Sequence, residues 1–368
     1  MNTGGRASSN SSPIAVRAGD HSQIQYEKEL DAGALFVLKS KGSWIHCGYY
    51  LTTSIVAPPL LSLPFAFASL GWVAGVICLT MGAIITFYVG CLLLVMAQIL
   101  SFHSLRHINL ISLVLCLAYS MCATAGSIYI RFSSNAPPKD YTVKGSTINT
   151  VFGVFNAVAI ISTTFGNGII PEIQATLAPP LKGKMLKGLS VCYSTVIVTF
   201  FSVAISGFWA FGNNAGGIII SNFMDENGRS LVPKWYLLFT NVLLLLQLSA
   251  VSVVYLQPTN ELLEKTFSDP KSGEFSARNV IPRLISRSLS VLLAVTIATM
   301  LPFFGDIIAL IGALWFTPLD FVLPFIFFNH TFKPSIAVFF SIFAIIAAVA
   351  PVRQITLDAT NYRLFANV

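Results

Sequence analysis

The sequence predicts an all-α polytopic membrane protein with about nine membrane spans. Of its 368 residues, 55% are hydrophobic and only 10% are charged, and the mean hydropathy is +0.74. A soluble globular protein carries about 25% charged residues. The apolar residues gather in segments of about 20 or more, the length that an α-helix needs to cross a bilayer. The net charge of +7 comes from Lys and Arg clustered between these segments, which is typical of membrane topology rather than nucleic-acid binding.

Residues 1–43 are predicted to form a cytosolic N-terminal tail. Residues 1–20 are rich in Ser, Asn, Gly and Ala, a composition typical of disorder. Residues 21–43 carry mixed charge and form either a short helix on the membrane surface or a plain connector. The polar first 40 residues indicate no cleavable signal peptide, so we expect the first apolar segment to direct membrane insertion.

The transmembrane domain is predicted over residues 44–352, with a short C-terminal tail over 353–368. The segment 71–100 is unusual because its 30 uncharged residues are too few for two helices and many for one. If it crosses once and the N-terminus is cytoplasmic, 15 of the 22 Lys and Arg residues lie on the cytoplasmic side. The positive-inside rule therefore favours one crossing by an overlong helix. The candidate spans are about 44–69, 71–100, 108–130, 151–177, 189–211, 235–258, 284–304, 307–328 and 335–352.

Two of these spans contain residues that interrupt a helix. Residues 57–64 read Ala-Pro-Pro-Leu-Leu-Ser-Leu-Pro, and residues 162–171 read Ser-Thr-Thr-Phe-Gly-Asn-Gly-Ile-Ile-Pro. Proline removes a backbone donor and clashes with the preceding turn. Within a bilayer, broken backbone is tolerated only where it is buried in protein or lines a cavity. One such segment could be a merely kinked helix, but two favour a transporter binding site.

Other classes of site find little support in the sequence. All six cysteines lie in or beside apolar segments and are expected to pack as small hydrophobic residues rather than to form disulfides. His103 and His107 lack a Cys or carboxylate partner nearby, so we expect no metal site there. There is no phosphate-binding loop, nucleophile elbow or dinucleotide fingerprint. We therefore predict neither an enzyme nor a bound cofactor.

Several motifs resemble the amino acid/auxin permease family, and its plant γ-aminobutyrate (GABA) transporter branch in particular. They are residues 31–72, FNAVAIISTTFGNGIIPEIQATL (155–177), GFWAFG (207–212), QPTNELLE (257–264), NVIPRLISRS (279–288), MLPFFGD (300–306) and PLDFVLP (318–324). The resemblance implies a LeuT-like (APC-type) fold in the plasma membrane. It also implies symport of GABA and related ω-amino acids driven by a proton gradient. The oligomeric state stays open.

The same resemblance explains the overlong segment. Family members normally have eleven spans, and the runs that resemble 71–88 and 90–98 belong to their second and fourth helices. Here Tyr88-Val89-Gly90 joins the two runs directly, so we interpret the chain as a shortened form with one fused helix in place of three. Losing two crossings preserves the orientation of everything downstream. Two alternatives stay open: a transport-dead isoform that regulates the full-length transporter, and a carrier for another neutral amino acid such as proline.

The two interrupted segments supply the predicted substrate site. Backbone N–H groups around Ala57, Leu60, Leu61 and Ser62 are expected to bind the substrate carboxylate, although Pro59 takes one donor away. The Ser62 hydroxyl either joins them or bonds its own helix backbone. On the other segment the opposite wall is predicted to comprise Thr164, Phe165, Gly166 and Asn167.

Further details of this site are also predicted. Phe165 either closes over the ligand or packs in the core. The substrate amine is expected on carbonyls freed by the break. The two segments should face each other across a cavity that is open where the third helix is missing.

Acidic residues within the spans are candidates for proton coupling. Asp320 lies well inside the span 307–328, between Pro318 and Pro324, and either carries the coupled proton or makes a structural pair or cap. Glu172 is expected near the cytoplasmic end of 151–177, where a cap or gate contact is the alternative role. Asp306 is expected at the outer surface.

Overall fold

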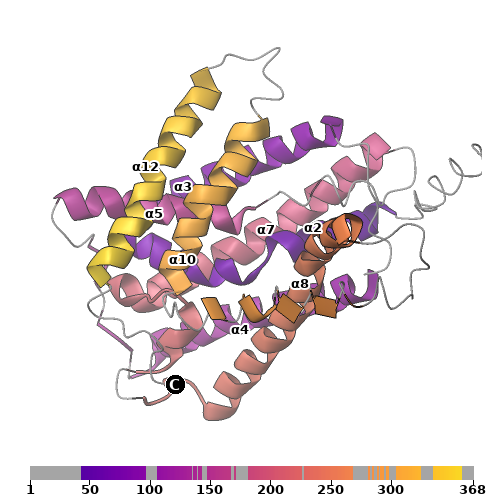
Figure 1. Cartoon of the computed structure of the whole chain (residues 1–368). Coiled ribbons are helices and arrows are strands. Elements are labelled where there is room, and N and C mark those ends of the chain that lie inside the picture. The colour runs from indigo at the N-terminus through magenta and orange to yellow at the C-terminus, as the bar shows by residue number, and fades with distance from the viewer. Residues whose placement is uncertain are drawn as a thin grey trace, which may run out of the picture.

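The computed structural model is nearly all helical (Figure 1). It describes residues 43–96, 106–134, 136–138, 140–142, 147–166, 170, 181–225, 228–267, 304–324 and 335–358, with scattered positions between 281 and 297. The expectations for residues 1–42 lie outside this part of the chain. The α-helices are α2 (Trp44–Ile55), α3 (Leu63–Met96), α4 (Arg106–Phe132), α5 (Thr147–Thr164), α7 (Leu181–Phe211), α8 (Lys234–Phe267), α10 (Phe304–Ile311) and α12 (Ser335–Asp358). Short 3₁₀ turns form η1 (Pro58–Ser62), η2 (Gly212–Asn214) and η3 (Ile219–Phe223), and η4 (Gly312–Val322) is a π-helix.

Five helical segments in the described part of the chain are long and apolar enough to span a membrane. Large apolar side chains on their outer faces are exposed, for example Val73 at 75% and Trp235 at 70%. These exposed apolar faces fit a lipid environment, so the chain is a polytopic membrane protein. The spans are Pro58–Tyr88, Asn109–Phe132, Thr147–Thr164, Gly183–Asn214 and Lys234–Ser252, and a shorter apolar helix covers Ser341–Leu357.

The long helix α3 passes once along α7, in the opposite direction. Near its start, the ring of Trp72 lies 4.8 Å from that of Phe208, and near its end Phe87 lies 5.2 Å from Tyr193. The charge pattern predicted this single passage. α3 bends at Gly71, where φ is 75° and ψ is 179°. Only glycine adopts this positive φ without strain, so residues 63–70 form a separate half-helix before the corner.

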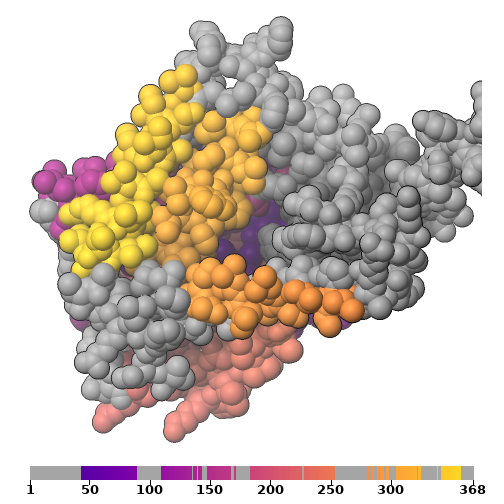
Figure 2. Space-filling model, viewed as in Figure 1, coloured from indigo at the N-terminus to yellow at the C-terminus, as the bar shows by residue number. Residues whose placement is uncertain are grey.

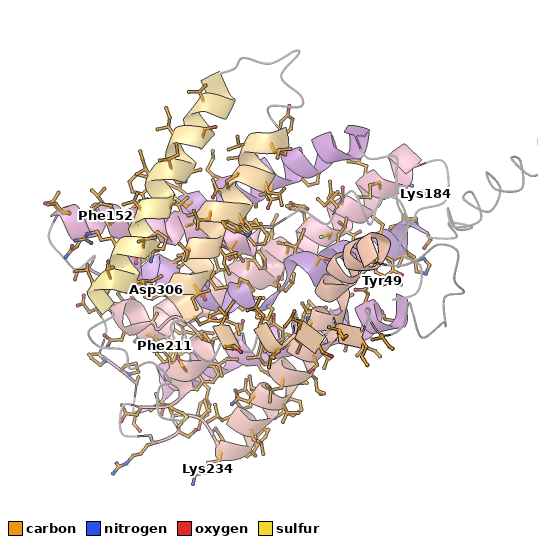
Figure 3. All side chains as sticks on the ribbon, in the orientation of Figure 1. Tyr49, Phe152, Lys184, Phe211, Lys234 and Asp306 are labelled. Carbon is orange, nitrogen blue, oxygen red and sulfur yellow. The ribbon has the colours of Figure 1, made fainter. Side chains whose placement is uncertain are left out.

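Lys184 and the start of α2 lie at one end of the helix bundle, and Arg131 lies at the other. At the Lys184 end, α2 starts beside α7: a Cβ placed on Gly188 would lie 3.0 Å from the Trp44 carbonyl oxygen. At the Arg131 end, α4 reaches the last turn of α7 through Tyr141, whose hydroxyl donates to the Trp209 carbonyl (2.8 Å). Figure 3 shows Lys184 and Tyr49 on one side of the molecule and Phe152 and Phe211 on the other. The basic α7 start therefore lies at the same end as the start of α2.

Helix α7 lies at the centre, packed against α2, α3 and α4. On another side, α5 packs against α3, α10, η4 and α12, and Figure 2 shows α12 beside the α10–η4 segment on one face. Small residues allow close approach, as is usual between membrane helices. Cys47, Cys116 and Cys192 are fully buried, and the cysteines whose side chains are described form no disulfide. They pack as small hydrophobic residues, as predicted.

Candidate substrate site

The first predicted interruption is present in the structure. α2 ends at Ile55, Ala57 is extended (φ −105°, ψ 168°), and η1 runs from Pro58 to Ser62 before α3 begins. Pro58 and Pro59 stand at the first two positions of η1, where proline is tolerated because those N–H groups have no partner within the turn. The Pro-Pro pair therefore ends one half-helix and starts the next.

Backbone hydrogen bonds close the break locally. The Val56 N–H donates to the Thr52 carbonyl (2.8 Å), the Ala57 N–H to Ile55 (2.8 Å) and the Leu60 N–H to Ala57 (3.1 Å). The two prolines have no N–H, so the carbonyls four residues before them cannot receive the usual helical bond. In this conformation the N–H groups of Ala57 and Leu60, which we expected to hold a carboxylate, are engaged in these turns, and the Ile55 carbonyl accepts from Ala57.

The side chains of Leu60, Leu61 and Ser62 are buried, each at most 1% exposed, whereas Ala57 is half-buried. The Ser62 hydroxyl donates to the carbonyl of Gly217 (2.6 Å), in the loop between η2 and η3. The two roles weighed from the sequence were a substrate contact and a bond within the Ser62 helix, and the observed bond is neither. Sequence reasoning missed Gly217, because a contact across 155 positions leaves no local signal.

The second interruption begins where predicted, since α5 ends at Thr164 and Phe165 and Gly166 leave the helix. The Thr164 hydroxyl bonds back to the Ile160 carbonyl (2.8 Å). Phe165 is fully buried, and its ring lies 5.0 Å from that of Phe200. A Cβ on Gly82 of α3 would lie 3.1 Å from the Phe165 ring. In this conformation Phe165 packs in the core, one of the two alternatives predicted for it.

The first interruption, η1, packs against α5, the helix that leads into the second interruption. Gly166 lies directly beneath the Phe316 ring, so that a Cβ there would be 3.2 Å from Cζ and closer to two other ring atoms. Asn167 and Glu172 lie outside the described residues. The cavity between the segments, with its open side, stays a prediction.

The two acids in the α10–η4 region are both buried. Asp320 is 1% exposed within η4, which packs against α5, α10 and α12. Asp306 is 5% exposed in the first turn of α10, and its expected place at the outer surface of the membrane stays a prediction. The neighbouring Gly305 packs closely, since a Cβ there would lie 3.1 Å from the Cα of Gly217. Figure 3 shows Asp306 at that end of α10.

Comparison with known proteins identifies the family. The model of the family described as "Transmembrane amino acid transporter protein" matches residues 40–101 and 89–352. The chain belongs to this family. Among its members, GABA transporter 1 of Arabidopsis thaliana is 49% identical over 447 aligned positions, covering 96% of this chain and 99% of that transporter. Lysine histidine transporter-like 6 of the same plant is 28% identical, with 74% of this chain and 63% of the relative covered.

The lengths of these matches bear on the junction predicted at Tyr88-Val89-Gly90. The alignment with GABA transporter 1 has 447 positions, more than the 368 residues of the chain. The relative therefore has a stretch with no counterpart here. The two family matches overlap at residues 89–101, directly after Tyr88, where the sequence indicated the junction. The family's members are transporters rather than enzymes.

Proposed function

We propose that this chain is a proton-coupled symporter that imports GABA and related ω-amino acids across the plasma membrane. The 49% identity with GABA transporter 1 over 99% of that protein supports this proposal most strongly. The paired interruptions of α2–α3 and α5 support it independently, since discontinuous helices mark transporter binding sites. The proposed architecture is LeuT-like with nine spans over 44–352, a cytoplasmic tail over 1–43 and a C-terminal tail over 353–368.

The proposed substrate site lies between η1 and the end of α5. The residues are Ala57, Leu60, Leu61 and Ser62 on one side and Thr164, Phe165, Gly166 and Asn167 on the other. The substrate ammonium group is proposed to bind backbone carbonyls at the break. A carboxylate needs donors, and those of Ala57 and Leu60 become available only when their turn bonds open. Asp320 and Glu172 are the proposed proton carriers.

Uptake into proteoliposomes tests this function directly. The full chain is reconstituted, an inward proton gradient is imposed, and entry of radiolabelled GABA is followed with and without a protonophore. We expect saturable uptake that the protonophore abolishes and that β-alanine inhibits more strongly than proline does. Equal counts in empty liposomes would refute the proposal, and stronger inhibition by proline would reassign the substrate.

A second function is favoured by the stretch of GABA transporter 1 that has no counterpart here. In this alternative the chain is a shortened, transport-dead isoform that lowers the activity of a full-length transporter by associating with it. Co-expression with a full-length transporter separates the two. Reduced GABA uptake at constant surface levels of the full-length protein supports regulation, whereas uptake by this chain alone excludes it.

A further inference from the structure

An arginine in an aromatic setting lies at the Arg131 end of the bundle, away from the η1–α5 site. Arg131 is in the last turn of α4. Its Nη2 donates to the Tyr141 hydroxyl (3.1 Å), and its guanidinium carbon lies 5.3 Å from the centre of the Trp209 ring. Tyr141 also packs against Trp72 and Phe208, with ring centres 5.9 and 5.5 Å away. The arginine is therefore held between α4, α7 and the segment 140–142.

The Arg131 side chain has more N–H donors than hydrogen bonds. A guanidinium has five N–H donors and no acceptor, and it stays charged in proteins. In the described part of the chain, Arg131 donates one side-chain hydrogen bond, and its Nη1 is buried without an acceptor. No ion pair to Arg131 is found among the described residues. The Tyr141 hydroxyl has no second hydrogen to donate, because its own hydrogen is donated to the Trp209 carbonyl.

A purely structural role explains how the positive charge of Arg131 is stabilised, but it leaves the buried Nη1 donor without an acceptor. The carboxyl end of a helix and the face of a tryptophan ring both stabilise a cation. Neither gives Nη1 the acceptor that a buried N–H requires. Beside the same segment, Asn213 donates to the Thr142 carbonyl while its own Oδ1 is buried without a partner. A buried donor, Nη1 of Arg131, and a buried acceptor, Oδ1 of Asn213, thus belong to side chains that bond the segment 140–142.

We propose that Arg131 binds the carboxylate of a zwitterionic amino acid at this end of the bundle. Arginine N–H groups match a carboxylate geometrically, and a carboxylate would supply the acceptor that Nη1 lacks. The site is separate from η1 and α5, and it reaches the half-helix 63–70 through Trp72, whose ring centre lies 6.5 Å from that of the buried Phe67. The choice of amino acid ligand rests on the proposed function.

Arginine modification of the wild-type chain provides the test. The full chain is placed in phosphatidylcholine nanodiscs and treated with phenylglyoxal, and the modification rate of each arginine is measured by mass spectrometry. GABA at ten times its dissociation constant should slow modification of Arg131 about tenfold. Arg353 is the internal control, because it also stacks on a ring (Phe152, 4.7 Å) but has an acceptor in Asn149 (2.7 Å). Unchanged modification of Arg131 overturns the proposal.

Variants give a second, independent readout. Equilibrium binding of radiolabelled GABA should show, in Arg131→Gln, one site whose affinity is weakened roughly 10- to 100-fold. Arg353→Gln should bind as the wild type does, and Arg131→Lys should keep part of the affinity. Equal binding by Arg131→Gln and wild type, with only a lower melting temperature, assigns Arg131 a structural role and overturns the proposal.

A lipid phosphate offers the same oxyanion chemistry, so the modification is repeated in nanodiscs containing phosphatidylglycerol. Protection by this lipid without protection by GABA assigns the site to lipid and overturns the amino acid ligand. Failure of the proposed function is distinguishable from failure of this site. Protection of Arg131 without any uptake refutes the proposed symport and supports the Arg131 site. Uptake without protection supports the proposed symport and refutes the Arg131 site.

Discussion

Replacing Gly312 by alanine should loosen the contact between the α10–η4 segment and α5. A Cβ at position 312 would lie 2.8 Å from the carbonyl carbon of Ala159, and closer still to that carbonyl oxygen and to the Thr163 hydroxyl. Carbon atoms are most favourable at about 3.5–4.0 Å, so the two segments must separate by about 1 Å. Backbone cannot rotate aside as a side chain can, and such overpacking costs about 1–3 kcal/mol.

The matched control is Gly183→Ala in α7, where a Cβ meets nothing within 4 Å. Both substitutions gain the backbone entropy that alanine brings to a helix, about 0.5–1 kcal/mol. The difference between the two variants therefore isolates the steric cost at Gly312. We expect the midpoint of thermal aggregation, followed by fluorescence-detected size-exclusion chromatography, to fall for Gly312→Ala and to stay level or rise for Gly183→Ala. A midpoint for Gly312→Ala at or above that of the wild type would refute the packing of α5 on η4.

Three other outcomes follow from described contacts. Gly207→Ala should also lower the midpoint, because its Cβ would lie 2.9 Å from Cβ of Pro64; an unchanged midpoint contradicts the contact of α7 with the half-helix 63–70. Ser62→Ala should destabilise the chain by about 1 kcal/mol by removing the bond to Gly217, and Ser62→Thr serves as the hydroxyl-retaining comparison. A water-soluble maleimide should modify the fully buried Cys47, Cys116 and Cys192 only after denaturation. Rapid labelling of any of the three in the native protein would show that this cysteine is not buried.

The sequence predicted the features that depend on local composition. Apolar length predicted the spans found at Asn109–Phe132, Thr147–Thr164, Gly183–Asn214 and Lys234–Ser252, while the count of nine stays a prediction. The Pro-Pro pair located the end of α2 within two residues of the predicted interruption. The single passage of α3 followed from the distribution of Lys and Arg. Each of these properties is written in neighbouring residues, because helix length, proline chemistry and loop charge act locally.

The sequence did not predict which distant residues contact each other in the fold. The bond from Ser62 to Gly217 joins residues far apart in the chain, so nothing around Ser62 predicted it. The close approach of Gly305, beside Asp306, to Gly217 also joins distant parts of the chain. The choice between substrate contact and core packing for Phe165 likewise depended on Gly82 and Phe200, which belong to other helices.

The corner at Gly71 has a mechanical consequence. Beyond it, α3 continues to Met96 as a rod of 25 residues, about 37 Å long at 1.5 Å per residue. The half-helix before the corner begins at η1, so both arms meet at one residue without a Cβ. A change of 10° at this joint would swing the far tip of the rod by about 6 Å. A small rotation near η1 is thus enlarged into a displacement of the far end of α3, which lies beyond Tyr88.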